Sequence, residues 1–426
     1  MSRDIYMHKT ITKSPNHQIT QSPNHSITKL VVAGGGTGGH VFPGIAVVEA
    51  MESHGRIDVM WIGTGRPVEK KALSGRKWDY RILNTRPLRG SGLAATMRSL
   101  AGLPFSTIRA CSWLKSFRPH VVLGVGGYVS GPALLAARML RIPAALHEQN
   151  LIPGLTNRLA SRFAKTVFVS FKETVKYFPK NRVIFTGNPI RKNIIQSLNH
   201  QITKSLATDP HRPTRTFQSL NHQITKSLNL LVLGGSQGAR CLNRLAGSAI
   251  QVLWQSGFHL EIIHQTGKLD VSHVEKFYKD ANIPAKVTPF IPNISESYSW
   301  ADLVICRAGA GTLAELTTLG KPSILIPYPW ATDSHQDANA RELTEAGAAK
   351  YFLEEEIGAI KLAGEIQSLL ENPQKLINMG ENARKLGKPT AATEIASTLI
   401  EMAGHTFSYS ETETNTLKGS TVRNHV

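Results

Sequence analysis

Cysteine is scarce in this chain. Only three cysteines occur among 426 residues, and Cys111, Cys241 and Cys306 lie far apart in the sequence. Their spacing matches no metal-ligand motif, and isolated thiols of this kind are typical of a protein that stays reduced in the cytosol. The length exceeds what one ordinary hydrophobic core covers, so two domains of moderate size are expected.

Long hydrophobic runs are also missing. The first 30 residues contain no apolar stretch of the kind that a secretory signal needs. The longest apolar segment, Val121–Ala137, is interrupted by glycines and a proline. Such interruptions favour a strand, a loop and a helix start over a membrane span. The sequence therefore predicts a soluble or peripheral protein.

Acidic residues are absent between Asp79 and Glu148, although the chain has a formal net charge of +19. The basic residues of this stretch are Arg81, Arg86, Arg89, Arg98, Arg109, Lys115, Arg118, Arg138 and Arg141. Nucleic acid, anionic lipid and phosphorylated substrates are all compatible partners. Leu93, Met97 and Leu100 share one helical face here. That face fits either a membrane-facing surface or a helix packed on its own sheet, and periodicity alone does not distinguish the two.

Short polar repeats occur twice. Ser14–Thr20 resembles Ser22–Thr28, and Gln196–Leu206 recurs unchanged at Gln218–Leu228. They carry no helical stripe and are too few to stack, so we interpret them as low-complexity insertions at the surface. Metal binding by their histidines (His17, His25, His200 and His222) is the alternative, which lacks support because no cysteine or acidic residue recurs with them.

With the repeats set aside, two similar halves remain. Strands are predicted at Leu30–Ala33, Val59–Ile62, Val121–Gly124, Ala144–His147 and Thr166–Val169, and then at Leu230–Leu233, Leu260–His264, Lys286–Phe290, Leu303–Cys306 and Ser323–Ile326. Helical segments alternate with them, which predicts two doubly wound α/β domains. The expected divisions are a repeat extension (1–29), a first domain (30–190), a linker with the second repeat pair (191–229), a second domain (230–388), a helix returning to the first domain (389–404) and a polar tail (405–426).

Each half opens with a glycine-rich turn between a strand and a helix. Gly34–Gly39 satisfies the G-x-G-x-x-G pattern, and Gly234–Ala239 occupies the same place in the second half, with Ser236 adding a hydroxyl. Such turns suit phosphate, because glycine amides and a helix N-terminus approach an anion closely. A dinucleotide site also requires a carboxylate at the end of the second strand, and Trp61–Gly65 has none. The two turns instead predict a site for a diphosphate compound that lies between two domains.

Further polar clusters follow other strands. They are Gly126–Gly131, His147–Asn150, Arg307–Thr312 with Glu315 behind it, and Asp333–Ala340. Ligands of open α/β sheets bind at such strand ends. Taken singly, Gly126–Gly131 and His147–Asn150 are each better explained as a cap or turn. Glu315 fits a ribose ligand or a partner of the helix dipole, and Asp333 fits a helix cap.

Taken together, nine motifs in order resemble the MurG family over about Leu30 to Met402. They are GGGTGGHVFPG, RGSG, GVGGYVSGP, HEQN, GNPIR, LVLGGSQGAR, FI, CRAGAGTLAEL and DSHQDANA. The resemblance implies two Rossmann-like domains facing across a cleft (GT-B type). It implies transfer of N-acetylglucosamine (GlcNAc) from UDP-GlcNAc to the muramyl C4 hydroxyl of undecaprenyl-linked lipid I, with inversion, in peptidoglycan synthesis. The donor is expected mainly on the second domain and the lipid mainly on the first.

Carried over by motif, the donor site comprises Thr37, Gly38, Gly39, Asn150, Arg191, Ser236, Ile291, Ala310, Gly311, Thr312, Leu313, Ala314, Glu315 and Gln336. In this scheme the backbone of Ile291 binds uracil, Glu315 binds the ribose and Gln336 binds the GlcNAc hydroxyls. His40 is the first candidate for the catalytic base, because it ends the first glycine turn and titrates near neutrality; Glu148 and Tyr128 are the alternatives. No Asp-x-Asp pair accompanies the motifs, so neither a metal nor a cofactor is expected.

The expected partners are UDP-GlcNAc, lipid I and an anionic membrane surface at the cytoplasmic face of the inner membrane, where other cell-wall synthesis proteins are further candidates. One competing interpretation is a related transferase that uses another lipid, such as diacylglycerol. Another is a nucleic-acid-binding module, which the charge alone suggests. The sequence contains no aromatic-rich sheet motif or zinc site, so nucleic acid is not expected as a partner.

Overall fold

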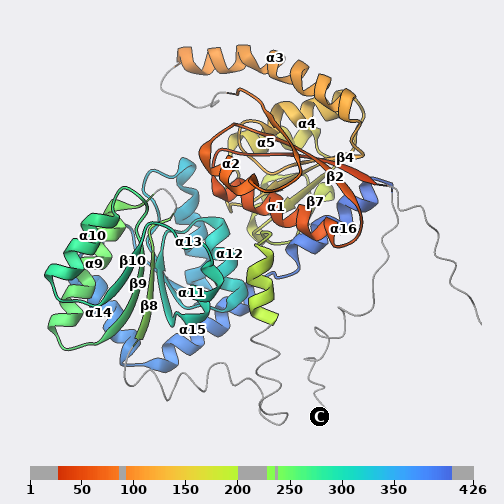
Figure 1. The fold of residues 1–426 in the computed structure, drawn as a ribbon. Helices are drawn as coiled ribbons and strands as arrows, with labels where there is room; N and C mark the ends of the chain where they lie inside the picture. Colours follow the sequence, from red (N-terminus) through yellow and green to blue (C-terminus); the bar gives the residue numbers. More distant parts are fainter. Residues whose placement is uncertain (1–26, 86–92, 200–227, 236–237, 405–426) are drawn as a thin grey trace, which may run out of the picture.

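The computed structural model describes residues 27–85, 93–199, 228–235 and 238–404, which form two lobes, each built on its own sheet (Figure 1). The strands of the first sheet are β1 (Thr28–Ala33), β2 (Ile57–Gly63), β3 (Asp79–Ile82), β4 (Val121–Gly124), β5 (Ala144–Glu148), β6 (Thr166–Val169) and β7 (Val183–Phe185). Their order across the sheet is β3-β2-β1-β4-β5-β6-β7. Each pairing is parallel, so the carboxyl ends of the strands share one edge.

Helices cover both faces of the first sheet. They are α1 (Gly38–Glu52), α2 (Pro67–Leu73), α3 (Leu93–Phe117), α4 (Ser130–Met139) and α5 (Leu155–Ala160), with 3₁₀ turns η1 (Ser161–Phe163), η2 (Lys172–Tyr177) and η3 (Lys180–Arg182). Successive strand residues point to opposite faces: Leu30 and Val32 pack with α1, whereas Val31 and Ala33 pack with α3 and α4. Burial on both sides explains why β1 is continuously apolar from Leu30 to Ala33.

The second sheet repeats this plan with the order β10-β9-β8-β11-β12-β13, again with parallel pairings. Its strands are β8 (Leu228–Leu233), β9 (Leu260–Gln265), β10 (Ala285–Thr288), β11 (Leu303–Cys306), β12 (Ser323–Leu325) and β13 (Ala349–Tyr351). Its helices are α9 (Arg240–Gln255), α10 (Val271–Asp280), α11 (Ile294–Trp300), α12 (Ala310–Leu319), η4 (Thr332–Ser334), α13 (His335–Glu345), α14 (Ala359–Leu370) and α15 (Pro373–Leu386).

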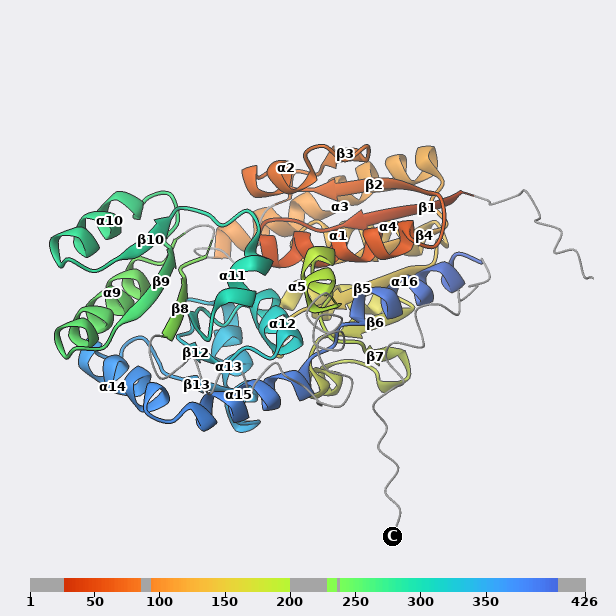
Figure 2. The same cartoon turned by 60° about the horizontal axis from the view of Figure 1, so that its bottom comes forward.

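The last described helix, α16 (Ala391–Met402), leaves the second domain and lies along α1 of the first (Figures 1 and 2). Ile395 and Leu399 are fully buried there, in the same apolar cluster as Val47 and Met51 of α1. The first domain is thus completed by a segment from the far end of the chain, which ties the two domains together at a second crossing.

The expected fold class, two doubly wound α/β domains, is confirmed. Strands β3, β7 and β13 were not foreseen from the sequence. Each is short and lies at or next to a sheet edge, and β3 is mostly exposed, so its pattern is not that of a buried strand. Most of both repeat pairs, the tail after residue 404, Ser236 and the side chains of Leu93, Met97 and Leu100 lie outside what the structure describes; of the repeats, only residues 27–28, 196–199 and 228 are described. Within the described ranges, no helix has the length and apolarity to cross a bilayer.

Candidate functional site

Loops that follow the carboxyl ends of both sheets meet between the domains. Asn339 of α13 is fully buried at this junction. Its Oδ1 accepts a hydrogen bond from the Leu151 amide at 2.9 Å, and its Nδ2 donates to Asn150 Oδ1 at 3.3 Å and to Ala308 O at 3.3 Å. The Asn339 amide group therefore joins the segment after β5 to the loop before α12.

A second junction contact is an ion pair. Arg191, which follows β7, donates from Nε (2.9 Å) and Nη2 (2.6 Å) to Glu315 Oε1 on α12. The other oxygen, Glu315 Oε2, accepts a hydrogen bond from the hydroxyl of Tyr298 at 3.0 Å. The Arg191 guanidinium also lies 5.3 Å from the ring of Phe42 on α1. The charge of Glu315 raises the pKa of Arg191 against the opposing effect of burial, so the guanidinium keeps its charge.

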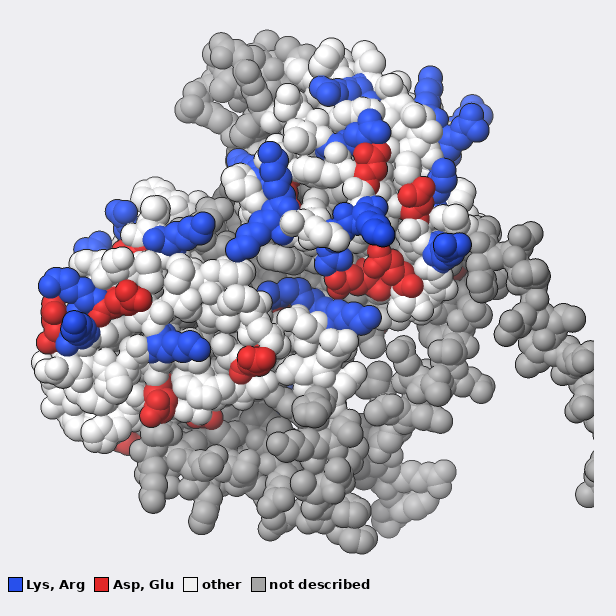
Figure 3. All heavy atoms as spheres, in the orientation of Figure 1, with Lys and Arg blue, Asp and Glu red and all other residues white. Residues whose placement is uncertain are grey.

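A third contact joins α2 to the loop after β10, where Lys71 Nζ lies 4.3 Å from the centre of the Phe290 ring. On the face drawn in Figure 3, Lys and Arg side chains lie on both domains and around the region where they meet. Cationic surroundings of this kind favour an anionic ligand between the domains.

The first glycine turn contains a carboxylate from its own domain. Glu69 of α2 is fully buried, and Gly36 N donates to Glu69 Oε1 at 2.6 Å. Thr64 N (2.7 Å), Gly65 N (3.1 Å) and Tyr80 Oη (2.8 Å) donate to Oε2, and the Thr64 hydroxyl donates to Oε1. These donors hold the pKa of Glu69 below its usual range although burial acts in the opposite direction.

This geometry corrects one expectation about the turn. The amide of Gly36 is engaged by Glu69 and cannot also bind a phosphate, and there is no room for a Cβ at Gly35 beside the same carboxylate. The groups that can still bind a phosphate at this turn are those at the N-terminus of α1. There Thr37 and Gly39 are exposed and Gly38 is half-buried.

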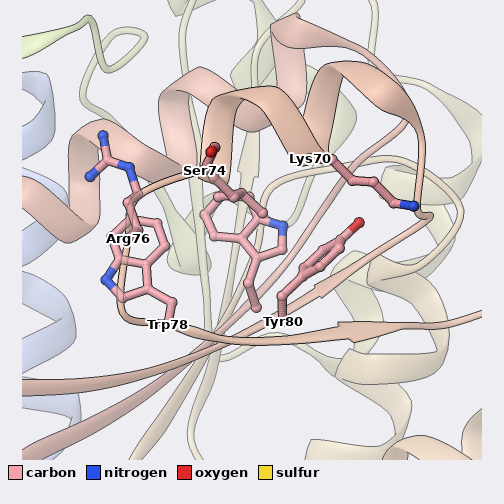
Figure 4. Close-up of a pocket in the computed structure, with 7 residues that line it drawn as sticks. Lys70, Ser74, Arg76, Trp78 and Tyr80 are labelled. Carbon is pink, nitrogen blue, oxygen red and sulfur yellow. The ribbon is translucent and has the colours of Figure 1, made fainter.

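A pocket of about 200 Å³ lies on the first domain, beside α2 (Figure 4). It is lined by Trp61, Lys70, Leu73, Ser74, Arg76, Trp78 and Tyr80. Arg76 pairs with Glu49 at 2.6 Å, and Trp78 donates to Glu52 at 3.2 Å. Two polar side chains that line the pocket therefore bind carboxylates of α1. Trp61 donates to Gly34 O at 3.0 Å. Together with the Tyr80–Glu69 bond, this wall of the pocket supports the first glycine turn.

His40 lies between two glycine loops. Its Nδ1 is 3.2 Å from Gly35 O, which can only accept, so Nδ1 carries the proton and Nε2 is left bare. Desolvation, together with the nearby charge of His335 across the junction, lowers the pKa of His40 to about 4 despite the bond to Gly35. The ring packs against Gly126, where an added Cβ would collide with it and where the φ of +94° would be strained for any other residue.

Glu148, the second candidate base, is buried at the end of β5 and only 1% exposed. Burial raises its pKa to about 7, although Asn150 N (2.9 Å) and Asn157 Nδ2 (2.8 Å) donate to it. Tyr128, the third candidate, stands before α4 and is 36% exposed. The structure thus gives the three candidates different environments: a half-buried neutral imidazole, a buried carboxyl group and an exposed phenol.

The N-terminus of α12 offers an open backbone. Its residues Ala310, Gly311 and Thr312 follow Gly309, and added Cβ atoms at Gly309 and Gly311 would meet nothing. Leu313 belongs to the run that the motif carried over to the donor site, and its side chain points into the domain. Leu313 is 1% exposed in the apolar core, and its amide donates to Gly309 O at 3.0 Å. Ala314 is half-buried beside the core, and Glu315 is the charged residue of this run.

At the start of α13, the Oε1 atom of Gln336 accepts a hydrogen bond from the amide of Tyr328 at 3.0 Å, which leaves its NH₂ group for other contacts. The alternative role of Asp333 as a helix cap is wrong: α13 begins after Ser334, and no side chain caps it. Ile291 is half-buried just after β10, near Phe290 and the contact with Lys71. In the described residues, no group of three potential metal-binding side chains occurs.

Three residues at this site were missed by the sequence analysis. Glu69 lies in a charged segment whose sequence resembles that of an ordinary surface helix. Tyr298 lies in a serine-rich segment that matches none of the motifs. Asn339 lies within the DSHQDANA motif but was given no role. The only available signals were an acidic residue soon after the second strand, for Glu69, and membership of a motif, for Asn339.

The fold and this junction define a two-domain transferase architecture, and the comparisons with known proteins agree. The glycosyltransferase family 28 N-terminal domain matches residues 30–169, and the family 28 C-terminal domain matches residues 229–395. An Acinetobacter baumannii MurG structure is similar with a TM-score of 0.68 and 32% identity, covering 88% of this chain and 99% of that one. The chain therefore belongs to glycosyltransferase family 28 and, within it, to the MurG family.

Curated relatives give the same result. Proteins named UDP-N-acetylglucosamine--N-acetylmuramyl-(pentapeptide) pyrophosphoryl-undecaprenol N-acetylglucosamine transferase from Myxococcus xanthus and Geobacter metallireducens are 39% and 40% identical. They cover 89% and 87% of this chain, and 94% and 98% of their own lengths are matched. A UDP-GlcNAc 2-epimerase from Neisseria meningitidis shares the fold alone, with a TM-score of 0.60 and 17% identity over 88% of this chain and 100% of the epimerase.

Proposed function

We propose that this protein transfers GlcNAc from UDP-GlcNAc to the C4 hydroxyl of the muramyl sugar of undecaprenyl-linked lipid I, producing lipid II with inversion at the sugar carbon. The names of the relatives supply the substrates. The observation in the structure that carries the proposal is the buried Glu315 carboxylate, held by Arg191 and Tyr298 directly behind the open start of α12. An ionised carboxylate beside backbone amides matches a ribose diol beside a diphosphate.

In this proposal the donor lies mainly on the second domain. Glu315 accepts a hydrogen bond from the ribose diol and the backbone at Ile291 binds uracil. The amides at the start of α12 and the second glycine turn with Ser236 face the diphosphate. Gln336 donates to a GlcNAc hydroxyl through the NH₂ group that Tyr328 leaves available. Thr37, Gly38 and Gly39 reach the diphosphate from the first domain, together with Asn150 at the junction.

His40 is the proposed general base. Its bare Nε2 accepts the proton of the muramyl hydroxyl as that oxygen attacks the sugar carbon and the bond to UDP breaks. A pKa of about 4 makes the free imidazole a weak base, and the negative charge of a bound diphosphate would raise it towards neutrality. Oriented amides and helix N-termini stabilise the UDP that leaves, in place of a metal ion.

The proposed membrane-binding surface is the outer face of α3. In its described half, Phe105 is 70% exposed and Ile108 is 67% exposed, while Ala110 and Leu114 are buried in the domain core. Arg109 and Lys115 are also exposed on this helix. Exposed apolar side chains beside cations suit an anionic bilayer, and we place this face against the cytoplasmic leaflet of the inner membrane.

A transfer assay with radiolabelled UDP-GlcNAc tests the function. The protein should label a muramyl-pentapeptide pyrophosphoryl-lipid acceptor and should leave diacylglycerol unlabelled. UDP-glucose should be a poor donor in the same assay. Transfer to diacylglycerol, or no transfer to either acceptor, would overturn the proposed function.

A further inference from the structure

Tyr298 holds the Glu315 carboxylate in the proposed donor site, but it has so far been given no function of its own. It lies on α11, is 1% exposed, and directs its hydroxyl to Glu315 Oε2 at 3.0 Å. Arg191 holds the other oxygen through two hydrogen bonds. Each oxygen of the carboxylate is therefore restrained by a different neighbour, one from the second domain and one from the segment after β7.

The phenol is a dedicated donor. Burial and the charge of Glu315 raise the pKa of Tyr298 well above its ordinary value, so the hydroxyl keeps its proton at any physiological pH. A buried hydroxyl without a partner is costly, and a bond to a carboxylate is stronger than one between neutral groups. The contact with Glu315 is thus a strong restraint on the direction of Oε2.

We propose that Tyr298 is a positioning residue for the donor ribose, which makes the site selective for ribonucleotide over deoxyribonucleotide sugars; this rests on the proposed function. A carboxylate accepts about four hydrogen bonds, and Arg191 and Tyr298 supply three. One acceptor position of Glu315 therefore remains for the ribose, and the orientation of the carboxylate that offers it is fixed by Arg191 and Tyr298. Without the Tyr298 hydroxyl, Glu315 turns towards Arg191, and the ribose hydroxyls lose a well-placed acceptor.

The test is Tyr298→Phe, which keeps the ring in the core and removes only the hydroxyl. Kinetics are measured with UDP-GlcNAc and with its 2′-deoxyuridine analogue. We expect the KM for UDP-GlcNAc to rise about tenfold with kcat within about twofold, because binding to ground state and transition state is weakened equally. The preference of the wild-type enzyme for the ribose donor over the deoxyribose donor should fall by about the same factor in the variant.

Tyr278→Phe is the matched control. Tyr278 is 2% exposed in the same domain, its hydroxyl is 3.0 Å from His264 Nδ1, and it packs in the cluster on the opposite face of the sheet. Loss of a buried phenol hydroxyl should lower thermal stability in both variants. Only Tyr298→Phe should change ribose preference. In a Glu315→Gln background, Tyr298→Phe should change the KM by less than about twofold, because Tyr298 acts through Glu315.

Three results would overturn the inference while the transferase itself stands. The first is an unchanged KM and ribose preference in Tyr298→Phe. The second is an equal loss of preference in Tyr278→Phe. The third needs no variant: active wild-type enzyme that uses the ribose and deoxyribose donors equally well. Failure of wild-type protein to transfer GlcNAc from either donor would instead reject the proposed function.

Discussion

The carboxylate of Glu69 accepts a hydrogen bond from the amide of Gly36 at 2.6 Å, which fixes the glycine turn after β1 from within its own domain. The same carboxylate binds amides after β2 and the Tyr80 hydroxyl from β3. One buried anion thus joins the turns after β1 and β2 to a side chain of the neighbouring strand β3. The turn is a prearranged support for the start of α1, with one of its own amides already occupied.

The first prediction concerns this anion. Because its folded-state pKa is depressed, Glu69 contributes stability that is present above its unfolded pKa and is lost as the pH falls through the lower folded pKa. Glu69→Gln should destabilise the protein by about 1–3 kcal/mol at pH 7 and should weaken the stability loss on acidification. Thermal unfolding across pH 3 to 7 measures both. Glu49→Gln, at a partly exposed pair with Arg76, should have a smaller effect; an equal effect would contradict the account.

The second prediction concerns the junction. Asn339→Ala removes the hydrogen bonds to Leu151 and Asn150 and leaves buried groups without partners. We expect kcat/KM for transfer to fall at least tenfold, and small-angle scattering should show a larger radius of gyration. Asn378→Ala, on the exposed side of α15, is the control and should match wild type in both measurements. A compact, fully active Asn339→Ala protein would show that the contact does not matter.

The sequence was informative where a feature is local. Central strands such as Val121–Gly124 and Thr166–Val169 were predicted with their observed bounds, because strands buried on both faces are continuous apolar runs. The donor-site residues came from ordered motifs. What escaped prediction depends on contacts distant in sequence: Arg191 and Glu315 are 124 positions apart, and Gly36 and Glu69 are 33 apart. No local pattern shows that Glu69 occupies the glycine turn or that Tyr298 supports Glu315.

The third prediction separates the candidate bases by pH. The acid limb of kcat/KM reports the pKa of the essential base in the free enzyme. If neutral His40 is required, activity should persist until the pH falls towards about 4; if ionised Glu148 is required, activity should already halve near pH 7. We expect the first result, with turnover reduced at least 100-fold in His40→Ala and less in Glu148→Gln. Near-normal turnover of His40→Ala would remove it as the base.

The fourth prediction tests the membrane surface. Replacing Phe105 and Ile108 by serine should reduce binding to liposomes that contain anionic lipid, since each side chain loses apolar contact with the bilayer. Sedimentation with the liposomes measures the bound fraction at low salt. Ile360→Ser is the control, because Ile360 is 79% exposed on α14 of the other domain. Binding that survives the double substitution, or that Ile360→Ser also weakens, would place the membrane contact elsewhere.

The central claim is that the donor binds at the Glu315 carboxylate, held by Arg191 and Tyr298, without a metal ion. Titration calorimetry with UDP-GlcNAc in the presence of EDTA tests it most directly. The account predicts one donor per chain, affinity unchanged by added Mg²⁺, and affinity at least tenfold weaker in Glu315→Gln. Binding that requires Mg²⁺, or a Glu315→Gln protein that binds as tightly as wild type, would contradict it.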